Sequence, residues 1–372
     1  MRWMRRWQKL RAHPQIIQGM TLGTLLRVLA RNRFIVDTQC LGRLAYLLVL
    51  GVFNSLFGAY ESLFNARAIK RVKLEKPPLF ILGHWRSGTT HLHNLLCRDN
   101  RLVCPRALQA EFPHHFVVTF TQFGGSLFNF IAPPRRPMDN VTFAANVPHE
   151  DEFALAAFSA VSPYMKTLFP VTDDNAYSCL DPRDLSPKAL EEWKQALILF
   201  LKKLTLLQPG RVVLKSPPHL GRVATLLEMF PGAQFVHIVR NPYDVYPSAC
   251  KLWKDSFAHA HLQIPDAEQI DELILSWYTE LFDLFERDRV LIPRGDLYEM
   301  TYEDLEAQPI ETLRAMYEHL DLPGFEPFSK RVTAYLATIS NYQKNAYRLD
   351  DATREKVAER WRCTFERYGY PV

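Results

Sequence analysis

The stretch GHWRSGTT, residues 83–90, combines small, hydroxyl and cationic residues in the spacing of a phosphate-binding loop. It follows the apolar run LFIL (79–82) and precedes a segment of helical period, so backbone N–H groups would converge on an anion there. Its cation is Arg86, before the second glycine, whereas a nucleoside-triphosphate loop carries lysine after that glycine. The binding groups that we expect come from four consecutive residues: Ser87, Gly88, Thr89 and Thr90. The alternative is a tight turn that binds nothing.

A second pair of residues could bind another phosphate. Arg240 ends the apolar run QFVHIVR, and Ser248 follows eight residues later, two turns into a helix that starts at Asn241-Pro242. The alternative is an arginine paired with a local carboxylate such as Asp244. Two phosphate sites on neighbouring strands predict a nucleotide whose phosphates are separated, rather than a contiguous triphosphate.

The elements that must position these residues are short apolar runs separated by segments of helical period. Fully apolar strands separated by helices predict an α/β fold with a central parallel sheet covered on both faces. Residues 100–190 are rich in proline and aromatic residues, and we interpret them as an irregular insertion that shapes a pocket. The expected strands are 79–84, 211–216, 234–240 and the first part of 297–305, and the expected helices include 219–230 and 306–320.

These motifs resemble those of sulfotransferases that use 3′-phosphoadenosine 5′-phosphosulfate (PAPS). FILGHWRSGTT is similar to their 5′-phosphosulfate loop, and FVHIVRNPYDVYPSA to their 3′-phosphate motif, including the eight-residue spacing. VVLKSPPHL and YEMTYEDLEAQPIETLRAMYEHLDLP are also similar. The resemblance covers residues 77–372 and is greatest to the large bacterial sulfotransferases, with tyrosylprotein sulfotransferases more distant. It implies a three-layer, P-loop-like α/β domain.

The resemblance implies transfer of a sulfuryl group from PAPS to a hydroxyl or amine by in-line displacement. Arg86, where many cytosolic relatives use lysine, would stabilise charge on the 5′-phosphate as the S–O bond breaks. Lys215, at the carboxyl end of the strand RVVLK, would contact the transferring sulfate; the alternative is a strand-end lysine facing solvent. No metal ion is expected, because the sequence shows no acidic partner for magnesium.

The resemblance also implies a base that removes the acceptor proton, a glutamate or a histidine downstream of the loop. Glu111 is the first candidate, and Glu150 or Glu152 the second, although an acidic group after Pro148 is also typical of a solvated helix start. Four histidines are further candidates, more typical of polar lining: His114, His115, His149 and His219.

The C-terminal part departs from the pattern of the cytosolic sulfotransferases, because their R-K-G motif for the 3′-phosphate and adenine is absent. Lys344, in ISNYQKNAYRLD (339–350), is the substitute that we predict on its position. A solvated lysine at a helix start is the alternative.

The first 76 residues differ from the rest in charge and hydropathy. They hold fourteen Lys/Arg and three acids, whereas the whole chain has a net charge of only +5. They also contain LAYLLVLGVFNSLFGAY (44–60), which has no charge over 17 residues. This segment is a helix packed on the catalytic domain, an interfacial helix on anionic lipid, or a membrane span. We therefore divide the chain into a basic, apolar helical segment, 1–76, and a sulfotransferase domain, 77–372.

The six cysteines form no C-x-x-C pair and no zinc spacing, so we expect reduced thiols in a cytoplasmic protein, at the inner face of the membrane if residues 1–76 dock there. The basic residues concentrate at one end, which argues against nucleic acid as a partner. The acceptor, small or lipid-like, and the oligomeric state stay open.

Two other functions compete with sulfuryl transfer. A P-loop kinase or NTPase is opposed by the missing loop lysine and magnesium partner. A membrane-peripheral protein that binds a nucleotide without catalysis is opposed by the intact loop, the Arg240–Ser248 pair and Lys215 together.

Overall fold

The computed structural model describes residues 17–123, 144–172, 174, 177, 179–340 and 347–372. By its contacts the chain divides into two compact units. One, here called the helical unit, comprises Met1–Leu74, Pro105–Pro209 and Lys251–Ile270. The other, the sheet unit, comprises Glu75–Cys104, Gly210–Cys250 and Asp271–Val372. The segment 77–372, which we expected to form one domain, therefore contributes to both units.

The sheet unit is built on a parallel sheet of five strands in the order β2-β3-β1-β4-β5. All four strands that the sequence predicts are present, and a two-residue edge strand, β2, was missed. The strands are β1 (Leu79–Leu82), β2 (Leu102–Val103), β3 (Arg211–Lys215), β4 (Gln234–Val239) and β5 (Leu297–Thr301). The first strand in the chain is thus the central one, and the order of strands reverses beside it.

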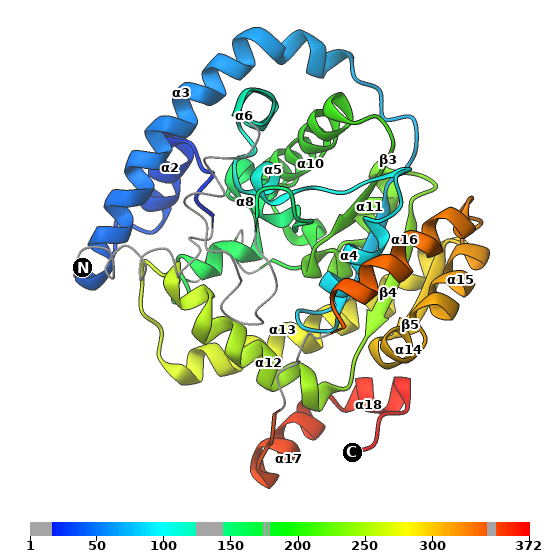
Figure 1. Cartoon of the computed structure of the whole chain (residues 1–372). Helices are drawn as coiled ribbons and strands as arrows, with labels where there is room; N and C mark the ends of the chain where they lie inside the picture. The colour runs from blue at the N-terminus through cyan, green and yellow to red at the C-terminus, as the bar shows by residue number, and fades with distance from the viewer. Residues whose placement is uncertain (1–16, 124–143, 173, 175–176, 178, 341–346) are drawn as a thin grey trace, which may run out of the picture. The chain divides into compact units, whose positions relative to one another are not determined.

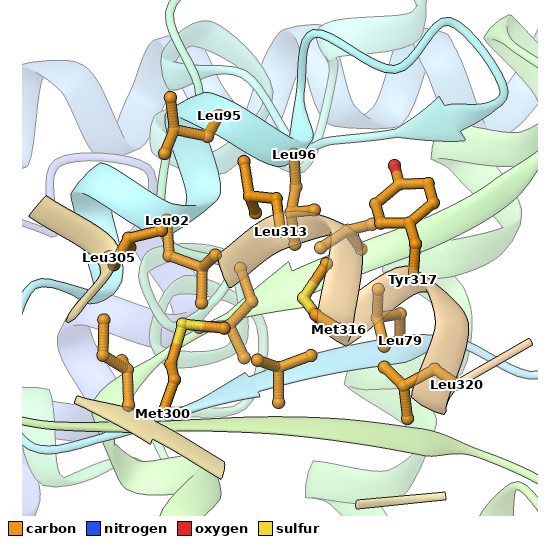
Figure 2. Close-up of a cluster of buried hydrophobic side chains, with 14 of the residues drawn as sticks. Leu79, Leu92, Leu95, Leu96, Met300, Leu305, Leu313, Met316, Tyr317 and Leu320 are labelled. Carbon is orange, nitrogen blue, oxygen red and sulfur yellow. The ribbon is translucent and has the colours of Figure 1, made fainter. Parts of the chain in front are cut away.

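Both faces of this sheet are buried, as the apolar runs predict. On one face, Leu79 packs in a cluster with leucines of α4, and with Met316 and Tyr317 of α15 (Figure 2). On the other face the Phe80 ring stacks on the Phe235 ring, with centroids 5.6 Å apart. The sheet unit is therefore a layered α/β structure, with side chains packed on both faces of its sheet.

Prolines decide where two helices of the sheet unit begin. The expected helix 306–320 is divided by Pro309, which lacks an N–H and begins a new helix. The expected helix 219–230 begins only at Val223, because Pro217 and Pro218 initiate a 3-10 turn. The described helices that lie wholly or mainly in this unit are α4 (Thr89–Leu96), α11 (Val223–Met229), α12 (Pro242–Asp255), α13 (Ala267–Asp288), α14 (Tyr302–Ala307), α15 (Pro309–His319), α16 (Phe325–Thr338), α17 (Asp351–Arg360) and α18 (Arg362–Tyr368), with 3-10 turns at Pro217–Gly221 and Arg289–Leu291.

The helical unit contains most of the expected insertion and the N-terminal segment. Its longest helix, α3, spans 31 residues and lies beside α2 (Figure 1). Its described helices are α2 (Leu22–Arg31), α3 (Leu41–Arg71), α5 (Ala107–Glu111), α6 (Phe116–Phe123), α8 (Glu152–Ser159) and α10 (Pro187–Leu207), with 3-10 turns at Thr38–Cys40, Pro163–Thr167, Pro182–Asp184 and Phe257–His259.

The expectation that the cysteines are reduced is wrong for one pair. Cys97, at the end of α4, and Cys104, after β2, are joined in a disulfide. The turn between α4 and β2 brings their Cα atoms to 5.9 Å, a separation at which disulfides ordinarily form. The sequence spacing of seven could not reveal this, because the approach depends on the direction of β2.

We predict that breaking this disulfide destabilises the sheet unit. Cys97→Ser should lower the free energy of unfolding by about 2–4 kcal/mol, because the cross-link limits the unfolded chain. Denaturant unfolding without reductant measures the loss, and Cys363→Ser, a free cysteine of the same unit, is the matched control. An equal midpoint for both variants would contradict the prediction.

Candidate functional site

The strand ends of the sheet unit bring the predicted cations to one edge. The loop with Arg86 follows β1, Lys215 ends β3, and Arg240 follows β4 directly. Since β3 and β4 flank β1 in a parallel sheet, their carboxyl ends meet beside that loop. The crevice where strand order reverses is the usual ligand site of open α/β sheets.

The loop after β1 adopts backbone angles that suit a phosphate loop. Arg86 and Gly88 have left-handed φ values of 72° and 98°. At Gly88 a glycine is required, because a Cβ there would lie 2.3 Å from the ring of Tyr302. The loop thus passes against an aromatic ring, with no room for a side chain at its second glycine.

Helix α4 begins at Thr89 with Gly88 as its N-cap, which offers no side chain to cap the helix. The first N–H groups of any helix lack intrahelical acceptors, so this end suits an anion. The Ser87 hydroxyl, a predicted ligand group, instead donates to the His84 carbonyl at 2.8 Å and so closes the turn.

Arg86 and Ser248, which the sequence assigned to different phosphates, are in direct contact. The Nε of Arg86 donates to the Ser248 hydroxyl oxygen at 2.8 Å. The Tyr347 hydroxyl also reaches that oxygen, at 3.5 Å. The loop cation is therefore oriented by the helix that follows β4.

Arg240 makes only long contacts with the described residues around it. Its guanidinium lies 3.5 Å from the Arg86 carbonyl oxygen and 3.4 Å from the Asp244 carboxylate. It also lies over the Tyr302 ring, 4.5 Å from the centroid. Its Nε is buried and finds no hydrogen-bond acceptor in the described part of the chain. The ion pair with Asp244 that we considered exists, but it leaves Arg240 with donor capacity suited to a phosphate.

Lys215 is fully buried, with 1% of its surface exposed, which excludes the solvent-facing alternative. Its Nζ donates to the Thr90 hydroxyl at 3.3 Å, so the end of β3 is linked to the first turn of α4. A buried ammonium at this edge is a strong electrostatic partner for an anion.

His84, the second residue of the loop, is a positioning residue. Burial lowers its pKa to about 3, so it stays neutral at pH 7. Its Nδ1 lies 2.9 Å from the Trp85 carbonyl oxygen, and its ring packs on the Tyr278 ring at 4.6 Å. We therefore do not assign it a proton-transfer role.

The three predicted acidic bases, Glu111, Glu150 and Glu152, lie in the helical unit, whereas the candidate His219 lies in the sheet unit. Glu111 is buried; its Oε1 lies 3.1 Å from His149 Nε2, while its Oε2 finds no hydrogen-bond donor among the described residues. Glu152 accepts a hydrogen bond of 2.6 Å from the Ser162 hydroxyl. Glu150, which is half-buried, accepts one from the Tyr164 hydroxyl, and the full burial of Glu152 does not match a solvated helix start. Lys344 lies outside the described residues.

Two residues of the site were missed by sequence reasoning. Tyr302, which contacts both Gly88 and Arg240, begins α14 directly after β5, and its position after a strand was the available signal. Tyr347 lies in the segment where we expected a cation, but nothing in the sequence connected it to Ser248.

Comparison with known proteins places these motifs in a family. A family model described as the sulfotransferase family matches residues 77–327. The omega-hydroxy-beta-dihydromenaquinone-9 sulfotransferase Stf3 of Mycobacterium bovis is 36% identical over 352 residues, which is 95% of this chain and 90% of that protein. Its counterpart in Mycobacterium tuberculosis matches equally.

Solved structures show the same fold. Sulfotransferase STF9 of Mycobacterium avium aligns with a TM-score of 0.63 at 21% identity, covering 83% of this chain and 80% of that one. Sulfotransferase STF1 of Mycobacterium tuberculosis aligns with a TM-score of 0.63 at 20% identity, covering 91% and 90%.

We predict that Gly88→Ala disrupts the loop. The new Cβ would overlap the Tyr302 ring, and overpacking of this kind costs about 1–3 kcal/mol. The shift of melting temperature caused by 3′,5′-bisphosphoadenosine should therefore shrink markedly. Gly295→Ala is the control, since Gly295 has the same φ of 98° but nothing within 4 Å of its Cβ position. If both variants bind like the wild type, the close contact at Gly88 is unimportant.

Proposed function

This chain belongs to the sulfotransferase family and is a sulfotransferase, and we propose that it transfers a sulfuryl group from PAPS to the hydroxyl, or an amine, of a lipid-like acceptor. One observation carries the proposal: Arg86, Lys215, Arg240 and Ser248 gather at the carboxyl ends of three adjacent strands. This arrangement offers two centres of positive charge, as a nucleotide with separated 5′- and 3′-phosphates requires.

In the proposed complex, each of the two sequence motifs, the loop at Arg86 and the segment from Arg240 to Ser248, binds a different end of the donor. The N-terminus of α4 and the Arg86 guanidinium would hold the 5′-phosphosulfate. Arg240 would hold the 3′-phosphate, and the Ser248 hydroxyl, bonded to Arg86, would link the two groups. The fit is supported by the buried Arg240 Nε without an acceptor among the described residues.

The reaction is an in-line displacement at sulfur. The acceptor oxygen forms a bond to sulfur while the bond to the bridging oxygen breaks, and the electron pair of that bond stays on the 5′-phosphate. Arg86 would stabilise this growing charge, and Lys215 the equatorial sulfate oxygens. Because both cations are held in place before the reaction, little reorganisation is needed as charge develops.

The acceptor proton passes to a base, for which we keep Glu111 first and Glu150 or Glu152 second. Glu111 Oε2 has no described hydrogen-bond donor, so this oxygen could take a proton without breaking a described hydrogen bond. Glu152 and Glu150 each already accept a hydrogen bond from a hydroxyl group, that of Ser162 and that of Tyr164 respectively. This difference supports the order that the sequence suggested.

The proposed acceptor class follows from the relative. The name of the mycobacterial protein specifies an omega-hydroxylated dihydromenaquinone, which is a long apolar molecule ending in a hydroxyl. Because the two chains align over nearly their whole lengths, we propose an acceptor of the same general kind, a hydroxyl on a lipid-like body.

A direct test measures donor use and transfer separately. The melting temperature should rise with 3′,5′-bisphosphoadenosine and not with ADP and Mg²⁺, because bound ligand stabilises the folded state. Incubation of ³⁵S-labelled PAPS with a lipid extract should then label an extractable product. Stabilisation by ADP-Mg²⁺ instead would favour a kinase-like activity.

We predict that Arg86→Ala lowers kcat about a hundredfold or more, while the affinity for bisphosphoadenosine falls much less. The bridging oxygen gains charge only in the transition state, so the lost interaction belongs mainly to that state. Ser248→Ala is the companion variant, because it removes the Arg86–Ser248 bond but keeps the cation. Loss of binding with unchanged turnover of the bound complex would mean that Arg86 only holds the nucleotide.

We predict that Arg240→Ala weakens 3′,5′-bisphosphoadenosine about ten- to hundredfold and leaves 5′-AMP affinity almost unaltered. Only the first ligand has a 3′-phosphate, and calorimetry of both ligands measures the difference. Asp244→Ala removes the ion pair of Arg240 without removing the cation, so it should not weaken either ligand. Equal losses for the two nucleotides would show that Arg240 does not contact the 3′-phosphate.

A further inference from the structure

Helix α3 buries several small and polar residues and exposes large apolar ones, the reverse of the usual arrangement. The face that is buried in the helical unit repeats at intervals of three and four and includes small and polar residues: Leu47, Gly51, Asn54, Gly58, Glu61 and Ile69. A helix on a water-soluble protein normally buries its large apolar residues and exposes polar ones. Here the glycines permit close packing, since a Cβ at Gly51 would lie 3.1 Å from Leu22.

The outward face of α3 carries the large apolar side chains. Val49, Phe53, Leu56 and Leu63 are 57%, 52%, 64% and 78% exposed, and their spacing by four, three and seven places them on one stripe. Phe64, beside them, is 63% exposed. Within the described residues, one helical stretch, Thr38–Arg71, is long and apolar enough to cross a membrane by length and composition. The side chains of this outer stripe contribute much of the apolar character of that helical stretch.

Polar contacts hold the inner face of α3 to the protein and argue against a span. The Asn54 side chain donates to the carbonyl oxygens of Gln18 and Met20 at 2.8 and 2.9 Å. The buried Glu61 carboxylate lies 2.5 Å from the Lys203 ammonium. Leaving such a charge pair unmade costs several kcal/mol, so α3 stays on the helical unit and exposes only its outer stripe.

The stripe ends in a basic cluster. Arg67, Lys70 and Arg71 follow Leu63 by four, seven and eight residues, so they continue the same face of the helix. An apolar stripe with cations beside it is the pattern of helices that lie in the interface of an anionic bilayer. A protein partner would need to match an apolar stripe and a cationic end, whereas a lipid surface supplies acyl chains and phosphates together.

A cavity of about 310 Å³ lies beside this basic end, entirely within the helical unit. Lys70 of α3 and Lys202 of α10 line it, together with Glu61 and Lys203. The charges of Glu61 and Lys203 compensate each other, so Lys70 and Lys202 leave the cavity cationic. His114 adds a polar group and no charge at pH 7, because burial lowers its pKa to about 4.

We propose that the outer stripe of α3 lies in the interface of an anionic membrane, and that the cavity between Lys70 and Lys202 binds the phosphate headgroup of an anionic phospholipid. Leu199, which lines the cavity, and Leu63 of the outer stripe would contact the acyl chains. This lipid site is separate from the proposed donor site and does not depend on the identity of the sulfuryl donor.

Vesicle flotation with the full chain tests the first half of the proposal. The protein should float with phosphatidylglycerol-rich vesicles and much less with phosphatidylcholine vesicles, and added salt should weaken the binding, since charges beyond a Debye length are screened. Failure to float with phosphatidylglycerol would overturn the proposal, even if bisphosphoadenosine still raises the melting temperature.

Leu63→Glu tests the stripe, and Val290→Glu is its control, because both side chains are 78% exposed. Leu63→Glu should lower the vesicle affinity about tenfold or more, since an apolar group leaves the acyl region. Val290→Glu should leave the affinity unaltered. Equal flotation of the two variants would mean that α3 does not contact lipid, and a concentration-dependent dimer that Leu63→Glu disperses would assign the stripe to a second copy instead.

Lys202→Glu tests the cavity, and Lys188→Glu, an exposed lysine near the start of the same helix, is its control. Neutralising one lysine near a charged surface costs about fivefold in affinity, and reversing its charge should cost more. Soluble short-chain phosphatidylglycerol should bind the wild type and Lys188→Glu but not Lys202→Glu. Equal binding to all three would overturn the headgroup site, as would binding of inorganic phosphate with the same affinity as the lipid.

Bisphosphoadenosine should raise the melting temperature of every variant alike, which shows that each is folded.

Discussion

The proposed donor site depends on the burial of β1 between β3 and β4. All four residues of β1 are fully buried, so this strand cannot shift without exposing the centre of the sheet. Its carboxyl end therefore gives the loop at Arg86 a fixed starting point, and the ends of β3 and β4 place Lys215 and Arg240 on either side. Lys215 and Arg240 are thus held by the ends of strands, and Arg86 by a short loop that starts from a buried strand.

The conformation of the loop after β1 also depends on its packing against Tyr302, a residue far away in the sequence. Tyr302 limits the backbone at Gly88, and the same ring lies under the Arg240 guanidinium. One aromatic residue after β5 thus connects the loop after β1 with Arg240, the two parts of the proposed donor site. A change at Tyr302 should affect both, although that residue need not contact the nucleotide.

The sequence predicted what depends on local pattern. The apolar runs predicted β1, β3, β4 and β5 because buried parallel strands are almost continuously hydrophobic. It did not predict β2, whose two residues are too few to form a pattern, or the bond between Arg86 and Ser248, which depends on the left-handed turn at Arg86. It also left open how 44–60 is placed, since composition does not reveal which face of a helix is buried.

The Arg86–Ser248 bond gives a physical reason for arginine in place of lysine in the loop. A guanidinium has five N–H donors in a rigid plane. Its Nε can therefore donate to the Ser248 hydroxyl while its two terminal NH₂ groups stay in a fixed orientation. A lysine ammonium at Arg86 would supply a charge but would have to divide one nitrogen between serine and phosphate. Lysine should therefore retain part of the electrostatic effect and lose the orientation. Because Ser248 belongs to the second motif, the loop cation should be best oriented when both phosphate motifs are in place.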